Sequence, residues 1–584
     1  MNNRQIVTSL LFAFVALLTA CDQPVEPKQA VTSPLLSPQT EPSSAAASVT
    51  LYVNADVVTV DDSNPSAQAL AVRDGRILAV GSRQEVELVA GEGADIRDMQ
   101  GKTIVPGLID AHGHISLTAM SQGFANIQPP PAGPVASIAQ LQQSLKDWDE
   151  AHPDMPWILG WGYDDSLLAE GRHPSRYDLD AVSTEKPVVL SHVSGHLMAC
   201  NSKCLEMTGI DASSEDPPGG VYQRVEGSQT PNGVLEESAI YKVYAMLPRG
   251  SEEQRVFMLE QAQTYYARHG ITTVQDGASQ LNNISDLQRA AAAKKLYLDV
   301  VGYRLLSKGE SIGETFTASS DYQDHYRIGG IKLVLDGSPQ GKTAWLSEPY
   351  AHPPHGQGKD YKGYPRLDDA EVNQFVSEAF TRGIPVLAHA NGDAAADQLV
   401  NAVALANDIH GAADRRTVMI HAQTVREDQI DQMQAQGIVP SYFVAHTFYW
   451  GDWHRDSVFG EERASRISPL QSTIKRNMLY TTHNDTPVVP ADMMRLLWSA
   501  VNRITRSGQV LGADQRVSPL EALKSMTINA AYQFFEENNK GSIEVGKLAD
   551  LTVLSANPLK VDAMAIKDIQ IEETIKDGKT VYSR

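Results

Sequence analysis

The chain has 584 residues, with 49 basic against 71 acidic side chains and a formal net charge of −22 at pH 7. This length is enough for one domain of barrel size together with one or two smaller domains. The acidic balance argues against nucleic acid and anionic membrane surfaces as partners, because both require a positively charged footprint. With only three cysteines, the chain has no disulfide framework.

Residues 6–20 form an apolar run after Arg4 that has the length of a signal-peptide core and is too short to span a bilayer comfortably. The run ends in Leu18-Thr19-Ala20-Cys21, which resembles the bacterial lipobox. We therefore expect a signal peptide over residues 1–20 and lipidation at Cys21. Residues 21–48 are rich in Pro, Ser, Ala and Thr and are expected to form a flexible tether.

These N-terminal features predict a protein that is lipid-anchored at the bacterial cell envelope and faces the periplasm. They leave open whether the inner or the outer membrane holds the anchor. An ordinary cleaved signal peptide, without lipidation, is the alternative interpretation.

The first folded residues show strand-like runs, and the turn Asp74-Gly75 separates two of them. An Asp-Gly pair between two β-rich runs is a strong short-range hairpin signal. Residues 541–584 repeat this strand-like pattern at the other end of the chain. We expect residues 49–103 and 541–584 to form one composite β-sandwich.

Between the two ends, apolar runs of strand length alternate with helical stretches, which is typical of βα units and a parallel sheet. Eight such strands are predicted, at residues 104–109, 271–276, 297–303, 330–335, 384–388, 416–420, 437–441 and 478–482. Helices are predicted at residues 252–269, 285–295, 368–382 and 426–436. The predicted fold is an α/β (β/α)8 TIM barrel over residues 104–114 and 266–540.

The segment between the first two predicted barrel strands breaks this rhythm. Residues 115–265 are too many for a single βα connection and carry strand and helix signals of their own. They are expected to form an inserted subdomain.

Candidate metal ligands follow or lie within the predicted barrel strands, at the ends where such barrels place their chemistry. They are His112, His114, Lys332, His389, His421 and Asp485. Neutral imidazole suits Zn²⁺, and a lysine can join such a site only when it is carboxylated and becomes an anionic oxygen bridge.

The motifs that carry these residues make the chain resemble the amidohydrolase superfamily. In chain order these motifs are Pro-Gly-Leu-Ile-Asp-Ala-His-Gly-His, Ile-Lys-x-x-x-Asp-Gly-Ser, His-Ala-x-Gly-Asp, Ile-His-Ala-Gln and Asp-x-Pro. Within the superfamily the chain is similar to the amidohydrolase-3 branch, which includes deformylases of N-substituted formamides. The resemblance implies that His112, His114 and Asp485 hold one metal, that His389 and His421 hold another, and that carboxylated Lys332 bridges the two.

Two positions depart from the family pattern, and the roles of two histidines stay open. The last strand has Asn484-Asp485 instead of Ser-Asp, which keeps the carboxylate. The inserted segment has Ser194-Gly195-His196 instead of Asp-Gly-His, which keeps the histidine and puts substrate recognition in doubt. His196 is either an electrophile for the substrate or a structural residue. His446 is either a substrate contact or a packing residue.

The expected activity is hydrolysis of a non-peptide C–N bond in a small amide or an N-acyl or N-formyl amine. Two divalent ions, expected to be Zn²⁺, would hold the attacking hydroxide, because a bound ion lowers the pKa of water to about 7. Asp485 would move its proton to the departing amine, and His196 would assist at the carbonyl oxygen.

Two alternatives remain at this point. One is a deaminase or esterase on the same fold, and the other is a non-catalytic lipoprotein that binds a ligand. The expected partner is a small-molecule amide, with no nucleic acid and with membrane contact only through the N-terminal lipid. The sequence leaves a homo-oligomer open.

Overall fold

The computed structural model describes residues 48–354 and 356–584. The predicted signal peptide, Cys21 and nearly all of the predicted tether lie outside the described residues. Within the described part of the chain, none of the helices has the length and apolar character needed to cross a membrane.

A four-stranded sheet is built from the first described residues. Its order is β5 (Arg76–Gly81), β4 (Ala69–Arg73), β1 (Thr50–Val53) and β6 (Asp95–Asp98). Strands β4 and β5 pair antiparallel up to Arg73 and Arg76, so the hairpin predicted at Asp74-Gly75 is confirmed. Ser82 directly precedes the short helix α1 (Arg83–Ala90) and caps its N-terminus with its side chain.

A six-stranded sheet joins the two ends of the described chain. Its order is β24 (Lys579–Ser583), β23 (Ile571–Lys576), β22 (Leu551–Leu554), β7 (Thr103–Pro106), β2 (Asp56–Val58) and β3 (Ser66–Ala67). Strand β22 pairs antiparallel with β7. Buried side chains of both sheets, such as Leu70 and Val553, pack in one apolar cluster.

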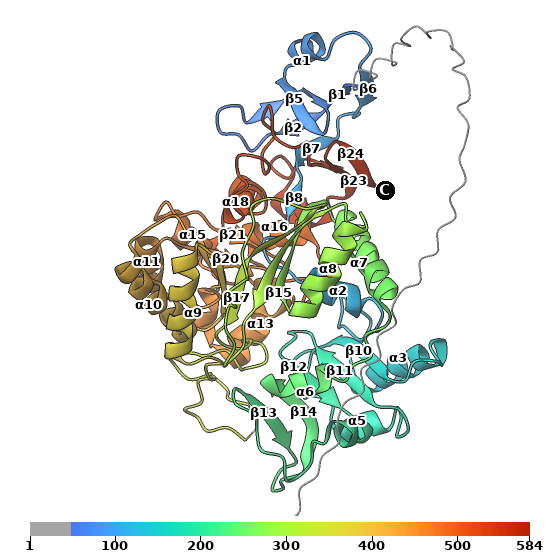
Figure 1. The fold of residues 1–584 in the computed structure, drawn as a ribbon, viewed down its shortest axis with the longest axis vertical. Coiled ribbons are helices and arrows are strands. Elements are labelled where there is room, and N and C mark those ends of the chain that lie inside the picture. Colours follow the sequence, from blue (N-terminus) through green and yellow to red (C-terminus); the bar gives the residue numbers. More distant parts are fainter. Residues whose placement is uncertain (1–47, 355) are drawn as a thin grey trace, which may run out of the picture. The chain divides into compact units, whose positions relative to one another are not determined.

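A third sheet has eight strands (Figure 1). Its order is β21 (Thr481–Thr482), β20 (Ile438–Tyr442), β19 (Thr417–His421), β18 (Val386–Ala390), β17 (Tyr326–Val334), β16 (Asp299–Leu305), β15 (Ile271–Ser279) and β8 (Leu108–Ile109). All neighbouring strands are parallel.

The sheet curls so that the segments following its two edge strands meet. The amide of Asp485, after β21, donates to the carbonyl of His112, after β8, at 3.1 Å. The amide of His114 donates to the carbonyl of Thr486 at 2.8 Å. Residues from opposite edges of the sheet are thus held side by side at its carboxyl end.

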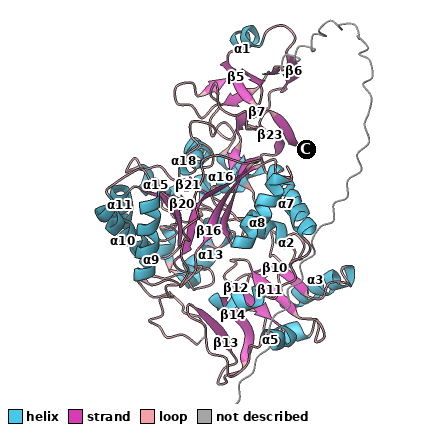
Figure 2. Cartoon of the chain, viewed as in Figure 1, coloured by secondary structure: helices cyan, strands magenta, loops and turns pink. Residues whose placement is uncertain are grey.

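Helices pack outside this sheet (Figure 2). The long ones are α7 (Glu252–Ala267), α8 (Leu281–Ala292), α9 (Asp369–Arg382), α10 (Asp393–His410), α11 (Glu427–Gln436) and α16 (Met493–Asn502). The four helices predicted from sequence are confirmed as α7, α8, α9 and α11, with ends that differ by a few residues. Apolar side chains such as Val372 and Phe375 of α9 bury that helix against the core.

The prediction of one barrel strand over residues 104–109 is wrong in its first half. The chain changes sheets at Gly107, whose amide donates to Asp550 at 2.7 Å, while the next amide, of Leu108, donates to Gly270 at 3.1 Å. A Cβ at Gly107 would lie only 2.4 Å from Thr272 Oγ1. Glycine is therefore required where the chain passes between the two sheets.

The segment between β8 and β15 contains a sheet of its own. Its order is β13 (Gly220–Arg224), β14 (Pro231–Glu237), β12 (Leu197–Cys200), β11 (Val188–His192), β10 (Ile158–Tyr163) and β9 (Ala125–Asn126). Helices α2 (Ile115–Ser121), α3 (Ile138–Ala151), α4 (Arg176–Asp180), α5 (Ser202–Thr208) and α6 (Tyr241–Tyr244) lie in the same segment. The predicted domain boundaries stay predictions.

Shorter helices complete the described chain after β20. They are α12 (His446–Tyr449), α13 (Gly451–Trp453), α14 (Glu461–Ser465), α15 (Leu470–Ile474), α17 (Pro519–Ser525) and α18 (Ile528–Gln533). A π-helix, His454–Val458, follows α13 directly.

Buried ion pairs hold the segment after α18 against the eight-stranded sheet. Lys540 Nζ lies 2.5 Å from Asp299 Oδ2 and 2.6 Å from Glu536 Oε2, and all three side chains are almost fully buried. We expect Lys540→Met to destabilise the protein by up to about 3–5 kcal/mol, because two buried carboxylates lose the cation they share, although Asp299 keeps Lys576 and Glu536 keeps Arg327. Urea unfolding followed by circular dichroism measures the loss.

Lys560→Met is the matched control for this prediction. Lys560 also pairs with a carboxylate, Asp56 at 2.7 Å, but its side chain is 68% exposed. An exposed ion pair contributes little, so this variant should lose only a small fraction of the stability that Lys540→Met loses. Equal effects of the two substitutions would contradict a stabilising role for the buried network.

Candidate metal centre

The six predicted ligands all lie at the carboxyl end of the eight-stranded sheet. His112 and His114 follow β8, and Asp485 follows β21. Lys332 lies near the end of β17, and β18 and β19 contribute the other two, His389 and His421. Parallel strands that curl together bring such residues to one place.

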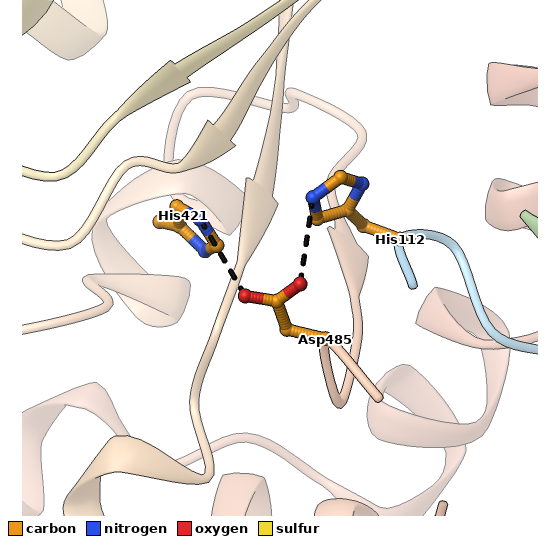
Figure 3. A group of neighbouring side chains, drawn as sticks. All are labelled: His112, His421 and Asp485. Carbon is orange, nitrogen blue, oxygen red and sulfur yellow. Dashed lines mark ion pairs between the residues drawn. The ribbon is translucent and has the colours of Figure 1, made fainter. Parts of the chain in front are cut away.

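Asp485 lies between three imidazoles, and Figure 3 shows those of His112 and His421. Its Oδ1 is 3.6 Å from His112 Nε2 and 3.0 Å from His114 Nε2. Its Oδ2 is 3.8 Å from His421 Nε2. Ligand atoms of His112, His421 and Asp485 all lie within 4.8 Å of one another, which is close enough to share one metal ion.

Lys332 and His389 complete the group. Lys332 Nζ lies 3.0 Å from His112 Nε2, and its side chain is only 1% exposed. The His389 ring lies 4.5 Å from the His421 ring, measured between centroids. The structure thus brings all six predicted residues into one cluster.

Three of the imidazoles are oriented by a partner on Nδ1, which makes Nε2 the nitrogen that could bind a metal ion, and His389 Nε2 also lies 3.2 Å from Asn391 Nδ2. The partners are Gln275 Oε1 at 2.5 Å from His112, Asp336 Oδ1 at 3.0 Å from His389, and His483 Nε2 at 3.1 Å from His421. Metal-binding histidines usually have such a partner on the second nitrogen, because it fixes the tautomer and the ring orientation.

Burial sets the charge of the candidate ligands. It lowers the pKa of His112, His389 and His421 well below the usual value, so these imidazoles are neutral, the form that binds a metal. Burial also lowers the pKa of Lys332 to about 7. Burial would raise the pKa of Asp485, but a hydrogen bond from His114 and nearby positive charge hold it below the usual value.

Two candidate ligands have unusual backbone conformations. His421 has φ of 73° and Asp485 has φ of 55°, both in the left-handed region that residues other than glycine rarely adopt. Such conformations cost free energy and are concentrated at functional sites, where the surrounding structure holds them in place. This donor set of imidazoles and one carboxylate, with oriented rings, fits divalent metal ions.

His196 lies beside this cluster, at the edge of the inserted segment. Its ring centroid is 5.0 Å from that of His389, and its Nδ1 lies 2.8 Å from Glu237 Oε2. Glu237 is fully buried and also pairs with Arg366 Nη1 at 3.1 Å. The sequence-predicted catalytic histidine is therefore held in place by a carboxylate.

A recess adjoins the cluster on the side of the inserted segment. It is lined by Ser194, His196, Ser338, Gln340, His389, Asn391, His421, Phe443, His446, Asp485 and Val488. His446 is almost fully buried, packs on Phe443 and has Nδ1 2.9 Å from His454 Nε2. Both interpretations of His446, substrate contact and packing residue, thus stay open.

Sequence reasoning missed several residues that support the cluster. Gln275 lies inside the predicted strand 271–276, where a buried amide gives no recognisable pattern. Glu237 lies in the inserted segment, outside the motifs used for recognition. His483 was given no role, although its spacing of two residues from Asp485 is the same as that of His112 from His114.

The chain matches the model of the amidohydrolase family over residues 95–582. It is 28% identical to the N-substituted formamide deformylase of Arthrobacter pascens, over 91% of this chain and 98% of that protein. It is 29% identical to Protein LONG AFTER FAR-RED 3 of Arabidopsis thaliana, over 87% of each chain.

A solved structure shares the fold. An uncharacterized metal-dependent hydrolase from Pyrococcus horikoshii OT3 superposes with a TM-score of 0.69 at 24% identity. The match covers 88% of this chain and 99% of that one.

Proposed function

The chain belongs to the amidohydrolase family of metal-dependent hydrolases, and from this premise we propose that it cleaves a non-peptide C–N bond in a small amide or an N-acyl or N-formyl amine. The convergence of Asp485 and its imidazoles at one end of the sheet is the observation that carries the proposal. The likeness to an N-substituted formamide deformylase over almost the full length of both chains supports this bond type.

The proposed cofactor is a pair of divalent metal ions, and we propose that both are Zn²⁺. His112, His114 and Asp485 would hold one ion, and His389 and His421 the other. Carboxylated Lys332 would bridge them, which its burial beside His112 supports. When bound, such ions supply an ionised water near neutral pH and polarise a carbonyl oxygen.

The chain's own residues would then position the substrate and move a proton. Asp485 is placed to take the proton of the attacking water and pass it to the departing amine, which leaves poorly unless it is protonated. His196 would contact the carbonyl oxygen as it gains negative charge. Glu237 is the positioning residue for His196, because it fixes Nδ1 and leaves Nε2 for the substrate.

We extend the proposal to the architecture and the location of the protein. The eight parallel strands form a closed (β/α)8 barrel, which the backbone hydrogen bonds between the segments after β8 and β21 support. The protein is anchored at the cell envelope by a lipid on Cys21 and faces the periplasm, which the lipobox-like sequence supports.

Removal and return of the metal test the proposed function. We expect dialysis against a chelator to abolish hydrolysis of an N-substituted formamide, and added Zn²⁺ to restore it with about two ions bound per chain. Elemental analysis gives the metal content, and amine release gives the rate. Hydrolysis that persists at zero metal content would rule the proposal out, and full activity with one ion would favour the deaminase-like alternative.

A further inference from the structure

Ser194, at the recess beside the metal centre, presents its oxygen as a hydrogen-bond acceptor. The backbone amide of Ser194 lies 3.2 Å from His192 Nδ1, and an amide can only donate, so Nδ1 carries no proton. The imidazole proton is therefore on Nε2, where it meets Asp165 Oδ1 at 3.1 Å. The Ser194 hydroxyl, 2.8 Å from Nδ1, must donate to it. One lone pair of the hydroxyl oxygen accepts from the backbone amide of His196 at 3.2 Å, and the other stays available.

Asn391 and Gln340 each have a buried acceptor in the recess that has no partner among the described residues, and Ser338 Oγ, which can accept or donate, is also unpaired there. Asn391 donates through Nδ2 to the Gly337 carbonyl at 2.9 Å, which fixes the orientation of its amide. Its Oδ1 is buried and unpaired among the described residues, and the side chain is only 4% exposed. Gln340 Oε1 is likewise buried and unpaired, in a residue that is also 4% exposed. A buried acceptor without a donor costs free energy, so a ligand that donates is favoured.

The charged side chains that line the recess also favour a neutral ligand over an anionic one. Among the described residues that line it, none is a lysine or an arginine, and the only carboxylate is Asp485. A substrate carboxylate would find no cationic side chain in this wall. The recess therefore suits a neutral group that offers several N–H donors.

We infer that the substrate is a ureido compound, an N-carbamoyl amine whose carbonyl carbon carries N–H groups on both sides. This inference rests on the proposed function and specifies its substrate class. A carbamoyl NH₂ supplies donors where a formyl hydrogen or an acetyl methyl supplies none. Hydrolysis would consume one water, break the bond between the carbonyl carbon and the substituted nitrogen, and release the amine and carbamic acid. Asp485 would deliver the proton to that nitrogen.

Binding of a matched ligand pair tests the inference without requiring turnover. Benzylurea and N-benzylacetamide differ only in NH₂ against CH₃. The benzyl group is chosen because a second recess, which shares Val488, has apolar side chains such as Leu167, Val193 and Trp450 in its lining, beside Asp164 and Arg506. With the Zn²⁺-loaded full chain in a titration calorimeter, we expect the urea to bind about tenfold more tightly or better, as one or two added hydrogen bonds would give.

Two variants locate the effect. Gln340→Met removes one acceptor at nearly constant volume and should reduce the preference for the urea about threefold to tenfold. Gln143→Met, on the exposed face of α3, is the matched control and should leave the preference unchanged.

The inference is overturned if the acetamide binds as tightly as the urea, if neither ligand binds, or if Gln340→Met leaves the preference intact in the folded protein. These results are independent of catalysis. A protein that prefers ureas yet hydrolyses no amide would refute the proposed function alone.

Discussion

Replacing Asp485 with asparagine is expected to lower kcat for an N-substituted formamide about 10³-fold, within the range that general acid–base groups contribute. The amide of asparagine keeps the size and one oxygen of the carboxylate, but it can neither take up the proton of the attacking water nor deliver one to the departing amine. Amine release under saturating substrate and Zn²⁺ measures the effect.

Asp397→Asn is the matched control for this variant. Asp397 lies on α10, where its carboxylate pairs with Arg426 at 3.0 Å outside the metal cluster. Its loss should leave kcat within a few-fold of the parent protein. Metal content is measured in both variants, because Asp485 is also a proposed ligand. If Asp485→Asn keeps its metal and its full rate, the carboxylate has no part in proton transfer.

That the candidate ligands lie together could be predicted from sequence, because they occupy recognisable places in a repeating pattern. His389 and His421 are at or beside the end of short apolar strands, and parallel strands must end at the same edge. The pattern needs only local information, namely where each strand stops. The position of these residues in space then follows from the parallel arrangement of the strands.

The supporting residues were hidden because their roles depend on contacts between distant segments. Glu237 is 41 positions from His196 in the chain, and Gln275 is 163 from His112. Nothing in the local sequence marks a buried amide or carboxylate as the partner of a particular imidazole. The break at Gly107 was missed for a similar reason, since only the approach of Thr272 makes glycine necessary there.

Replacing Lys332 with methionine is expected to reduce bound Zn²⁺ from about two ions to one or fewer per chain, and to lower kcat at least about 10²-fold. The lysine is buried beside His112, so an ammonium there would repel a metal, whereas a carboxylated lysine supplies two anionic oxygens. Lys332→Arg should behave like the methionine variant, because a guanidinium stays charged and is not carboxylated. Lys308→Met, in an exposed position, should change neither quantity.

The pKa of Lys332 gives this prediction a dependence on pH. CO₂ reacts with the free amine, and burial lowers the pKa of this amine to about 7 in the metal-free protein. At about pH 6 roughly a tenth of the chains carry the free amine, and at about pH 8 roughly nine-tenths do. Reactivation of metal-free protein by Zn²⁺ at a fixed concentration of dissolved CO₂ should therefore be several-fold faster at the higher pH, as followed by the recovery of activity. Since an ordinary surface lysine stays protonated at both pH values, equal reactivation rates would show that Lys332 is not carboxylated and that the ions, if two bind, are bridged by another group.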